Sequence, residues 1–158
     1  MRIFALLSMV FIATIAFAME VPVTLEQLTH DSDRIIRGRV MSISSHKGAN
    51  EFGDELIFTD VVVRADEALK GDRSQLKLTV EGGTVGGVTL AVSDSPQFRV
   101  GEEIVIFAKK DVSTFRPTYR SQSKYTVSAD GTVHPKGMPY DEFKKKILDA
   151  IQTQAKKP

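Results

Sequence analysis

The sequence has no cysteine and no tryptophan, and asparagine occurs only once. The lack of cysteine excludes disulfides, thiolate nucleophiles, iron–sulfur clusters and cysteine zinc sites, so the fold must be held by packing alone. Asn50 is followed by Glu51 and Phe52, which excludes an N-glycosylation acceptor. Small secreted eukaryotic domains are typically dense in disulfides, so these absences favour a bacterial exported protein.

An excess of charge of one sign is also missing. The chain has 21 Lys and Arg against 20 Asp and Glu, and without Arg2, which lies in the export segment described below, the basic count falls by one to 20. Nucleic-acid-binding domains normally carry a basic excess with interleaved aromatic residues. We therefore expect no nucleic-acid partner.

The first 18 residues have the pattern of a signal peptide. Arg2 supplies a short positive end, residues 3–17 are almost entirely apolar, and Ala16 and Ala18 place small side chains at the first and third positions before a cleavage site. We predict removal of residues 1–18 by cleavage after Ala18.

The alternative for this segment is a transmembrane anchor, which needs about 20 apolar residues and a basic flank. Glu20 and Pro22 follow instead, and a lipoprotein would need a cysteine at the cleavage site. We therefore expect a periplasmic or extracellular product without a membrane anchor after cleavage.

The remaining chain is of ordinary single-domain size. We expect one domain over residues 19–151 and a frayed tail over 152–158. Thr24 can cap a short helix at residues 25–30, and Tyr140, Phe143, Ile147 and Ile151 recur at helical spacing after Pro139.

Between these helices the pattern is that of short strands. Apolar and polar residues alternate, or apolar residues run together, in segments that turn residues separate. Gly38 predicts a bend or bulge in the first strand, residues 45–54 a polar loop, and Asp130-Gly131 a type I′ turn. Residues 104–108 are apolar without interruption, which predicts a strand covered on both faces. The predicted strands are 34–44, 57–66, 76–81, 88–92, 104–108, 118–120, 125–129 and 132–134.

This pattern predicts a mainly β fold, and within that class we favour a small OB-like Greek-key barrel with a short N-terminal helix and a C-terminal amphipathic helix. Long bent first strands and a crossing glycine-rich connection suit such a barrel, whose curvature leaves few exposed sheet edges.

The glycine-rich connection is the most unusual segment and includes Gly82, Gly83, Gly86 and Gly87. Glycine-rich loops can bind phosphate through backbone N–H groups, which makes a ligand loop one hypothesis. The segment lacks a Gly-Lys-Ser/Thr ending and lies between two predicted strands, so no helix N-terminus follows it. We favour a structural role, in which the glycines allow close backbone approach and positive φ angles.

No catalytic or metal-binding constellation is recognisable. The histidines His30, His46 and His134 show no ligand spacing, and the metalloprotease, serine-hydrolase and calcium-loop motifs are absent from the sequence. The doublets Asp66-Glu67 and Glu102-Glu103 place neighbouring carboxylates on opposite faces of a strand. We therefore predict no catalytic residue, no metal and no cofactor. Lys144–Lys146 leave open an anionic partner such as lipid or cell-wall polymer, although solvation of a helix face is the simpler interpretation.

Several segments together resemble a group of uncharacterised bacterial exported proteins with a GGxVGG segment. The resemblance rests on Leu25 and Leu28, SDRIIRGRV at 32–40, Phe58-Thr59, Val63, ALKG at 68–71, GGTVGG at 82–87, PQF at 96–98 and GEE at 101–103. The first half is also similar to the opening of netrin-like and TIMP-like OB domains, where a strand carrying a glycine leads to one that ends in Lys-Gly. The resemblance implies an OB fold. TIMP-like inhibitors chelate zinc through an N-terminal cysteine, and this chain has none.

These observations lead to the hypothesis of an exported, non-enzymatic, monomeric module that binds a protein, peptide or glycan in the envelope or outside the cell, and that accompanies a secreted protease. A periplasmic hydrolase with an unrecognised loop site, or an envelope structural or assembly subunit, are the alternatives. The hydrolase requires His46 or His134 within hydrogen-bond reach of a carboxylate.

Overall fold

The computed structural model describes residues 22–156, so the predicted signal peptide with Ala16 and Ala18 lies outside the described residues. The fold is mainly β, as predicted, and no helix within residues 22–156 is long and apolar enough to cross a membrane. The elements are α1 (Leu25–Asp31), β1 (Arg34–Ala49), β2 (Glu55–Lys70), β3 (Leu76–Glu81), β4 (Gly83–Val85), β5 (Val88–Leu90), β6 (Glu103–Lys110), β7 (Phe115–Pro117), the 3-10 helix η1 (Arg120–Ser123), β8 (Lys124–Val127), β9 (Thr132–His134), β10 (Met138–Pro139) and α2 (Tyr140–Ala155).

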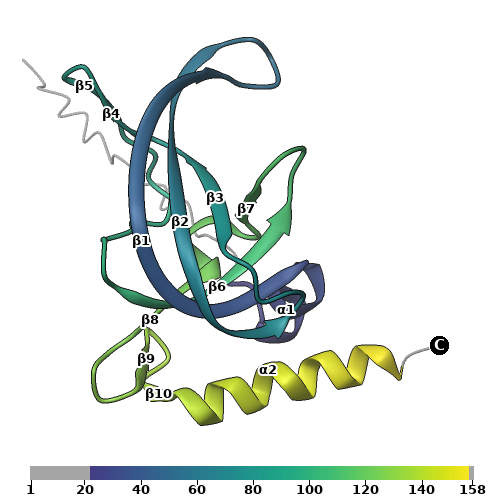
Figure 1. Cartoon of the computed structure of the whole chain (residues 1–158). Helices are drawn as coiled ribbons and strands as arrows, with labels where there is room; N and C mark the ends of the chain where they lie inside the picture. The colour runs from purple at the N-terminus through teal and green to yellow at the C-terminus, as the bar shows by residue number, and fades with distance from the viewer. Residues whose placement is uncertain (1–21, 157–158) are drawn as a thin grey trace, which may run out of the picture.

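The strands form an eight-stranded sheet with the order β1-β2-β3-β7-β6-β8-β9-β10, and β4 and β5 form a separate hairpin. β1 also pairs with β6, so a series of pairings leads from β1 through β2, β3, β7 and β6 back to β1. All of these pairings are antiparallel except that of β3 with β7. Figure 1 shows β1 and β2 as long, strongly curved strands.

Gly38 lies at one of the irregularities of the curved strand β1, where the sequence predicts a bend or bulge. The register between β1 and β2 shifts between Arg37 and Gly38, and a Cβ at position 38 would lie 2.2 Å from the carbonyl oxygen of Arg64. Only glycine allows so close an approach of the two backbones.

The hairpin of β1 and β2 is longer than the polar sequence 45–54 predicts. Pairing continues to Ala49 and Glu55, and only residues 50–54 form the loop. Main-chain hydrogen bonds do not require apolar side chains, and the Asn50 side-chain oxygen closes the turn by accepting hydrogen bonds from the backbone N–H groups of Phe52 and Asp54 at 3.0 and 2.8 Å.

Two buried clusters lie on opposite faces of β1 and β6. One contains Ile36, Val40, Ile104 and Ile106 together with residues of β2 and β3, and the other contains Ile35, Val105 and Phe107 together with residues of both helices. Residues 104–108 are all buried, which confirms the prediction that this strand is covered on both faces.

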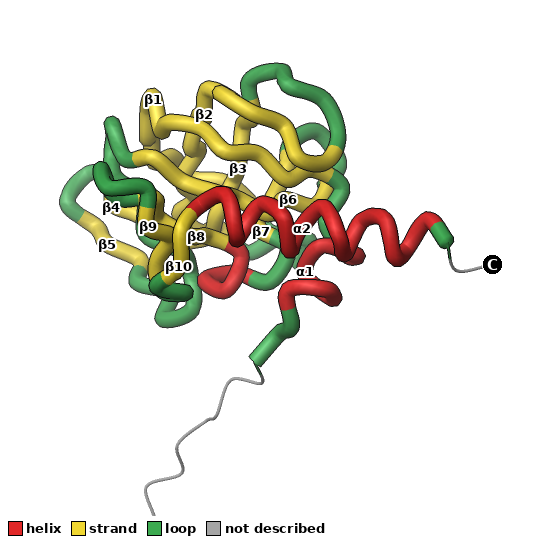
Figure 2. Tube along the Cα trace, turned by 90° about the horizontal axis from the view of Figure 1, so that it is seen from below, coloured by secondary structure: helices red, strands yellow, loops and turns green. Residues whose placement is uncertain are grey.

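Both helices pack on the second cluster. Figure 2 shows α1 and α2 against the same side of the sheet. Thr24 caps α1 as predicted, since its hydroxyl accepts a hydrogen bond from the Gln27 N–H at 3.1 Å. α2 continues beyond Ile151 to Ala155, into the segment that we expected to fray. Ile151 still packs on the cluster, and residues 152–155 contain no glycine or proline that would end a helix.

Two further local predictions are wrong. Residues 118–120 do not form a strand: β7 lies at Phe115–Pro117, where Phe115 packs on the apolar cluster, and the chain then turns into η1. The turn at Asp130-Gly131 is not of type I′, because Gly131 has a φ of 81° but Asp130 has no positive φ. The Gly131 N–H donates to the Ser128 carbonyl at 2.8 Å, which makes a tight turn that ends in a left-handed glycine.

A polar contact fixes the start of α2 on β2. The Glu67 carboxylate accepts hydrogen bonds from the Tyr140 hydroxyl at 2.7 Å and from the Lys144 ammonium. Burial raises the pKa of Glu67, but the hydrogen bonds from Lys144 and Tyr140 outweigh it, so the pKa lies below its ordinary value of 4.5.

This shift predicts a pH-dependent stability difference. A lowered folded-state pKa contributes stability above the unfolded pKa, and this contribution is lost as the pH falls through the folded pKa. We expect Glu67→Gln to be less stable than the wild type at pH 7, and the difference to shrink progressively as the pH falls below about 4.5. Urea unfolding at a series of pH values measures this. Glu51→Gln, in an exposed loop, controls for the loss of one carboxylate, and a difference for Glu67→Gln that is independent of pH would contradict the prediction.

Candidate functional site

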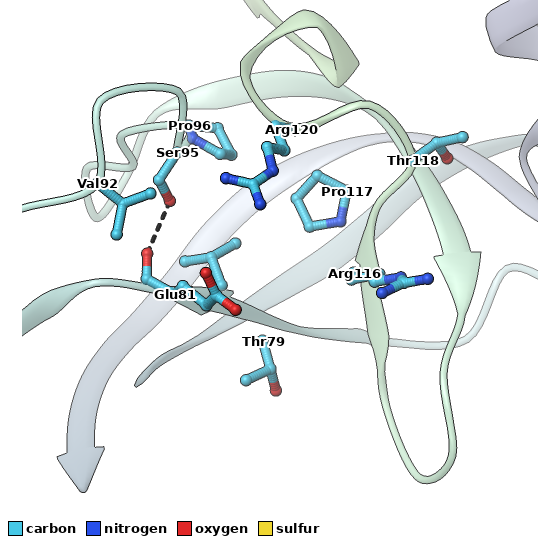
Figure 3. A pocket seen from close by; sticks show the side chains of 10 residues that line it. Thr79, Glu81, Val92, Ser95, Pro96, Arg116, Pro117, Thr118 and Arg120 are labelled. Carbon is cyan, nitrogen blue, oxygen red and sulfur yellow. Dashed lines mark hydrogen bonds between the residues drawn. The ribbon is translucent and has the colours of Figure 1, made fainter. Parts of the chain in front are cut away.

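The candidate site is a pocket of about 190 Å³ beside the end of β3, lined by both charged and apolar side chains (Figure 3). The end of β3, the segment from β7 into η1, and the turn around Ser95 form its walls. Its lining residues are Thr79, Val80, Glu81, Val92, Ser95, Pro96, Arg116, Pro117, Thr118 and Arg120.

The pocket exists because β3 and β7 separate after a single pair. Leu78 pairs with Phe115 in parallel, and the same register two residues further along would place Val80 opposite Pro117. Proline has no backbone N–H to donate, so the ladder cannot continue in the usual way. The strands therefore diverge at Pro117, and the pocket occupies the space between them.

The main chain of β3 faces this space. The Gly82 N–H donates to the Ile57 carbonyl of β2 at 2.8 Å. Because hydrogen-bonding groups alternate between the two edges of a strand, Glu81 and Thr79 direct their main-chain groups away from β2. The Ser95 hydroxyl, which donates to the Glu81 carbonyl at 2.9 Å, lies on that side.

Arg120 has an unusual backbone conformation. Its φ is 46°, and it is the only non-glycine residue within residues 22–156 with a positive φ. The guanidinium donates to the Asp94 carboxylate at 2.6 Å, and the backbone N–H of Ser121 donates to the Asp94 carbonyl at 2.9 Å. Figure 3 shows the Arg120 guanidinium directed into the pocket between Pro96 and Glu81. Strained residues of this kind are enriched at binding sites.

The hydroxyl groups in the pocket wall are already engaged, but the charged groups are not all paired. The Thr79 hydroxyl donates to Asp60 at 2.8 Å, and the Thr118 hydroxyl lies 2.7 Å from that of Ser32. Within the described part of the chain, no ion pair is formed by the side chain of Glu81 or Arg116. The pocket therefore offers free groups of both signs.

The predicted glycine connection lies next to this pocket. Gly82, Gly83, Gly86 and Gly87 have φ angles of 102°, 136°, 57° and 80°, and Gly86-Gly87 form the turn between β4 and β5. A second hollow of about 330 Å³ borders Gly82 and Gly83 and shares Glu81 and other residues with the first.

Gly83 also has a packing constraint. A Cβ at this position would lie 2.4 Å from the Thr59 hydroxyl and 2.5 Å from the Ser45 hydroxyl, which lie 2.9 Å from each other. The Thr59 hydroxyl in turn donates to the Gly82 carbonyl at 2.6 Å. These contacts hold the base of the β4–β5 hairpin on β1 and β2.

We expect Gly83→Ala to lower the free energy of unfolding by about 2–3 kcal/mol, because a methyl group collides with both hydroxyls and the φ is unfavourable. Gly87→Ala is the matched control: its φ is also positive, but no atom lies within 4 Å of its Cβ position. This variant should lose only about 1 kcal/mol. Equal losses in urea unfolding would contradict the packing argument.

The histidines are dispersed. The Nδ1 of His30 lies 2.6 Å from the carboxylate of the adjacent Asp31, which also accepts a hydrogen bond from Tyr119. The Nδ1 of His46 lies 3.8 Å from the Asp60 carboxylate, beyond hydrogen-bond reach. The Nε2 of His134 lies 3.3 Å from the Ser128 hydroxyl. Neither of the histidines considered for a hydrolase site has a carboxylate hydrogen bond.

The two carboxylates of the Glu102-Glu103 doublet form ion pairs with different residues. Glu102 pairs with Lys124 at 2.7 Å and Glu103 pairs with Arg37 at 2.5 Å. Across residues 22–156, no group of three or more His, Asp or Glu side chains is arranged to hold a metal ion. No protein-family model matches the chain, and no curated protein matches its sequence.

Sequence reasoning did not single out Glu81, Arg116 or Arg120. The available signal was the dipeptide Arg116-Pro117, since a proline at the end of a strand stops sheet pairing on one side. The strand that would pair with this proline is distant in the sequence, so the pocket between the two strands could not be predicted.

Proposed function

We propose that the mature chain is an exported, non-enzymatic binding module that takes a protein or peptide ligand in the pocket between β3 and β7. The observation that carries the proposal is a pocket in which charged side chains surround an apolar floor, next to the part of β3 that does not pair with β7. Val80, Val92 and Pro117 contribute to that floor. An apolar pocket with a few convergent polar groups is the usual form of a ligand site.

An OB-like Greek-key barrel is the architecture that we propose for this module. It is supported by the antiparallel and parallel pairings that lead from β1 through β2, β3, β7 and β6 back to β1. It is also supported by the curvature of β1 and β2 in Figure 1. In such barrels, loops at the rim of the sheet supply ligand contacts.

A peptide fits the pocket better than a glycan. Ligand recognition by an exposed strand edge uses main-chain hydrogen bonds, which a peptide can return along its whole length. The residues that line the pocket include no aromatic ring on which a sugar could stack.

Expression with the native leader tests export. We expect the protein recovered from the periplasm or medium of a bacterial host to begin at Met19, by intact-mass measurement, and we expect replacement of Ala18 by arginine to block processing. Protein that keeps Met1 and stays in the cytoplasm would contradict export.

Binding is tested with the exported protein on a displayed peptide library, a glycan array and a panel of hydrolase substrates. We expect saturable peptide binding and no turnover. Turnover that a single acid–base pair abolishes, or no binding to any of these probes, would contradict the proposal.

A further inference from the structure

The pocket is closed at both ends along the strand direction. At one end Leu78 pairs with Phe115, and at the other the Ser121 N–H donates to the Asp94 carbonyl at 2.9 Å while Arg120 pairs with Asp94 at 2.6 Å. A strand that passes through the gap would have to break one of these contacts. A chain end can enter without breaking either.

The chemistry of the walls distinguishes the two ends of a peptide. Arg120 uses one guanidinium contact on Asp94, and a guanidinium has five N–H donors, so further donors are free. Arg116 has no ion pair within the described residues, but its guanidinium is directed away from that of Arg120 (Figure 3), so Arg120 is the arginine that faces the pocket. Arginine binds a carboxylate with paired, charge-assisted hydrogen bonds, which makes it the preferred partner of that group.

The wall opposite Arg120 is formed by β3, whose main chain can hydrogen-bond to the peptide residues that precede the C-terminus. Thr79 and Glu81 direct main-chain groups toward the gap. The Glu81 carbonyl accepts a hydrogen bond from the Ser95 hydroxyl at 2.9 Å, so the groups for pairing with an extended segment are the Glu81 N–H and the Thr79 carbonyl. The Glu81 side chain lies across the pocket from Arg120 (Figure 3). It is placed to accept a peptide N–H and to repel an acidic terminal side chain.

The size of the pocket suits one side chain. Its volume is about 190 Å³, and an apolar cavity of about 150 Å³ already accommodates benzene. Val80, Val92, Pro96 and Pro117 line it with apolar surface. A terminal residue of the size of valine, leucine or phenylalanine would fill it.

We propose that this pocket binds the free C-terminus of an extended peptide that ends in an apolar residue. The terminal carboxylate binds to Arg120, the terminal side chain occupies the apolar floor, and the preceding residues pair with the edge of β3. This inference rests on the proposed binding function and specifies its ligand.

Fluorescence anisotropy tests it with the exported protein. The probes are labelled hexapeptides with random internal residues and a terminal valine, leucine or phenylalanine, each made with a free C-terminal carboxylate and as the C-terminal amide. We expect binding of the free acids and at least about tenfold weaker binding of the amides, the loss typical of a charge-assisted hydrogen-bond pair. Equal binding of acid and amide would overturn the inference.

Point variants test where the peptide binds, and their unfolding midpoints show whether a loss of binding comes from a loss of folding. Arg120→Gly relieves the positive φ, so it should keep or raise the unfolding midpoint and still lose binding at least about tenfold. Arg116→Ala removes an arginine of the pocket margin whose guanidinium is directed away from Arg120, so it should bind the free acids and the amides like the wild type. Arg73→Ala, an exposed arginine outside the pocket, is the matched control and should bind like the wild type. Unchanged binding by Arg120→Gly would overturn the inference.

The two proposals fail in different ways. If the protein binds internal peptide segments or glycans and ignores free C-termini, the C-terminal assignment is wrong and the binding module stands. If it binds none of these probes, both are wrong.

Discussion

Gly38→Ala should lower the free energy of unfolding by about 3 kcal/mol or more, enough to unfold much of a marginally stable domain. The added methyl group would lie 2.2 Å from the Arg64 carbonyl oxygen and 3.0 Å from its carbonyl carbon. Both are backbone atoms of a paired strand and cannot move aside by changing a rotamer. Relief therefore requires β1 and β2 to separate at Gly38, with loss of their pairing there. Urea unfolding followed by far-UV circular dichroism measures the effect.

Gly48→Ala is a stringent control, because it makes the same substitution in the same strand. Its Cβ position lies 3.1 Å from a ring atom of Phe58, a half-buried side chain that can rotate. We expect a loss below about 1 kcal/mol. A larger loss at Gly48 than at Gly38 would contradict the argument from the backbone contact at Gly38.

Phe143→Ala should destabilise the protein by about 3–5 kcal/mol, the usual cost of removing a fully buried phenylalanine. Phe143 is 0 % exposed, and its ring centroid lies 4.8 Å from that of Tyr125 and 6.4 Å from that of Phe107. The substitution leaves a cavity between α2 and the sheet. Because α2 docks through this residue, we expect the variant to unfold at a lower temperature. We also expect amide hydrogens to exchange faster in α2 than at residues 35–38 of β1.

Lys145→Ala, on the exposed face of the same helix, separates this packing effect from a change in helix propensity. It should shift the unfolding free energy by less than about 0.5 kcal/mol. If both variants behaved alike, the docking of α2 through Phe143 would be contradicted.

The elements that the sequence predicts well are those where side-chain burial and chain geometry agree. The uninterrupted apolar run at 104–108 becomes a strand buried on both faces, and Gly38 lies at a register shift in β1. Thr24 caps α1 through a local contact with Gln27. Each of these depends on a few neighbouring residues, so each can be interpreted without knowledge of the tertiary structure.

The predictions that are wrong depend on the main chain or on distant partners. The exposed end of the β1–β2 hairpin is held by backbone pairing from Ser45 to Ala49, which leaves no apolar signature in the sequence. The position of β7 depends on the packing of Phe115 against an apolar cluster that includes residues of β3. Asp130-Gly131 can form more than one tight turn, and the local hydrogen bonds of Ser128 decide which.

The candidate site could not be predicted for the same reason. Pro117 interrupts the pairing of β7 with a strand almost forty residues earlier, and the conformation of Arg120 depends on Asp94. The glycine connection was singled out because its composition is unusual. Glu81, Arg116 and Arg120 have ordinary neighbours in the sequence, and only the fold brings them together around one pocket.

Only part of β1 pairs with two neighbouring strands, and this has a consequence for motion within the molecule. From Ile35 to Arg39 this strand has partners on both sides, β2 and β6, whereas from Ser44 to Ala49 it pairs with β2 alone. Amide hydrogens of Ile35 to Gly38 should exchange with deuterium only when the whole domain opens, and those beyond Ser44 by fraying of the hairpin end. A single continuous strand thus contains both the most and the least protected parts of the curved sheet, with the transition between them near Val40.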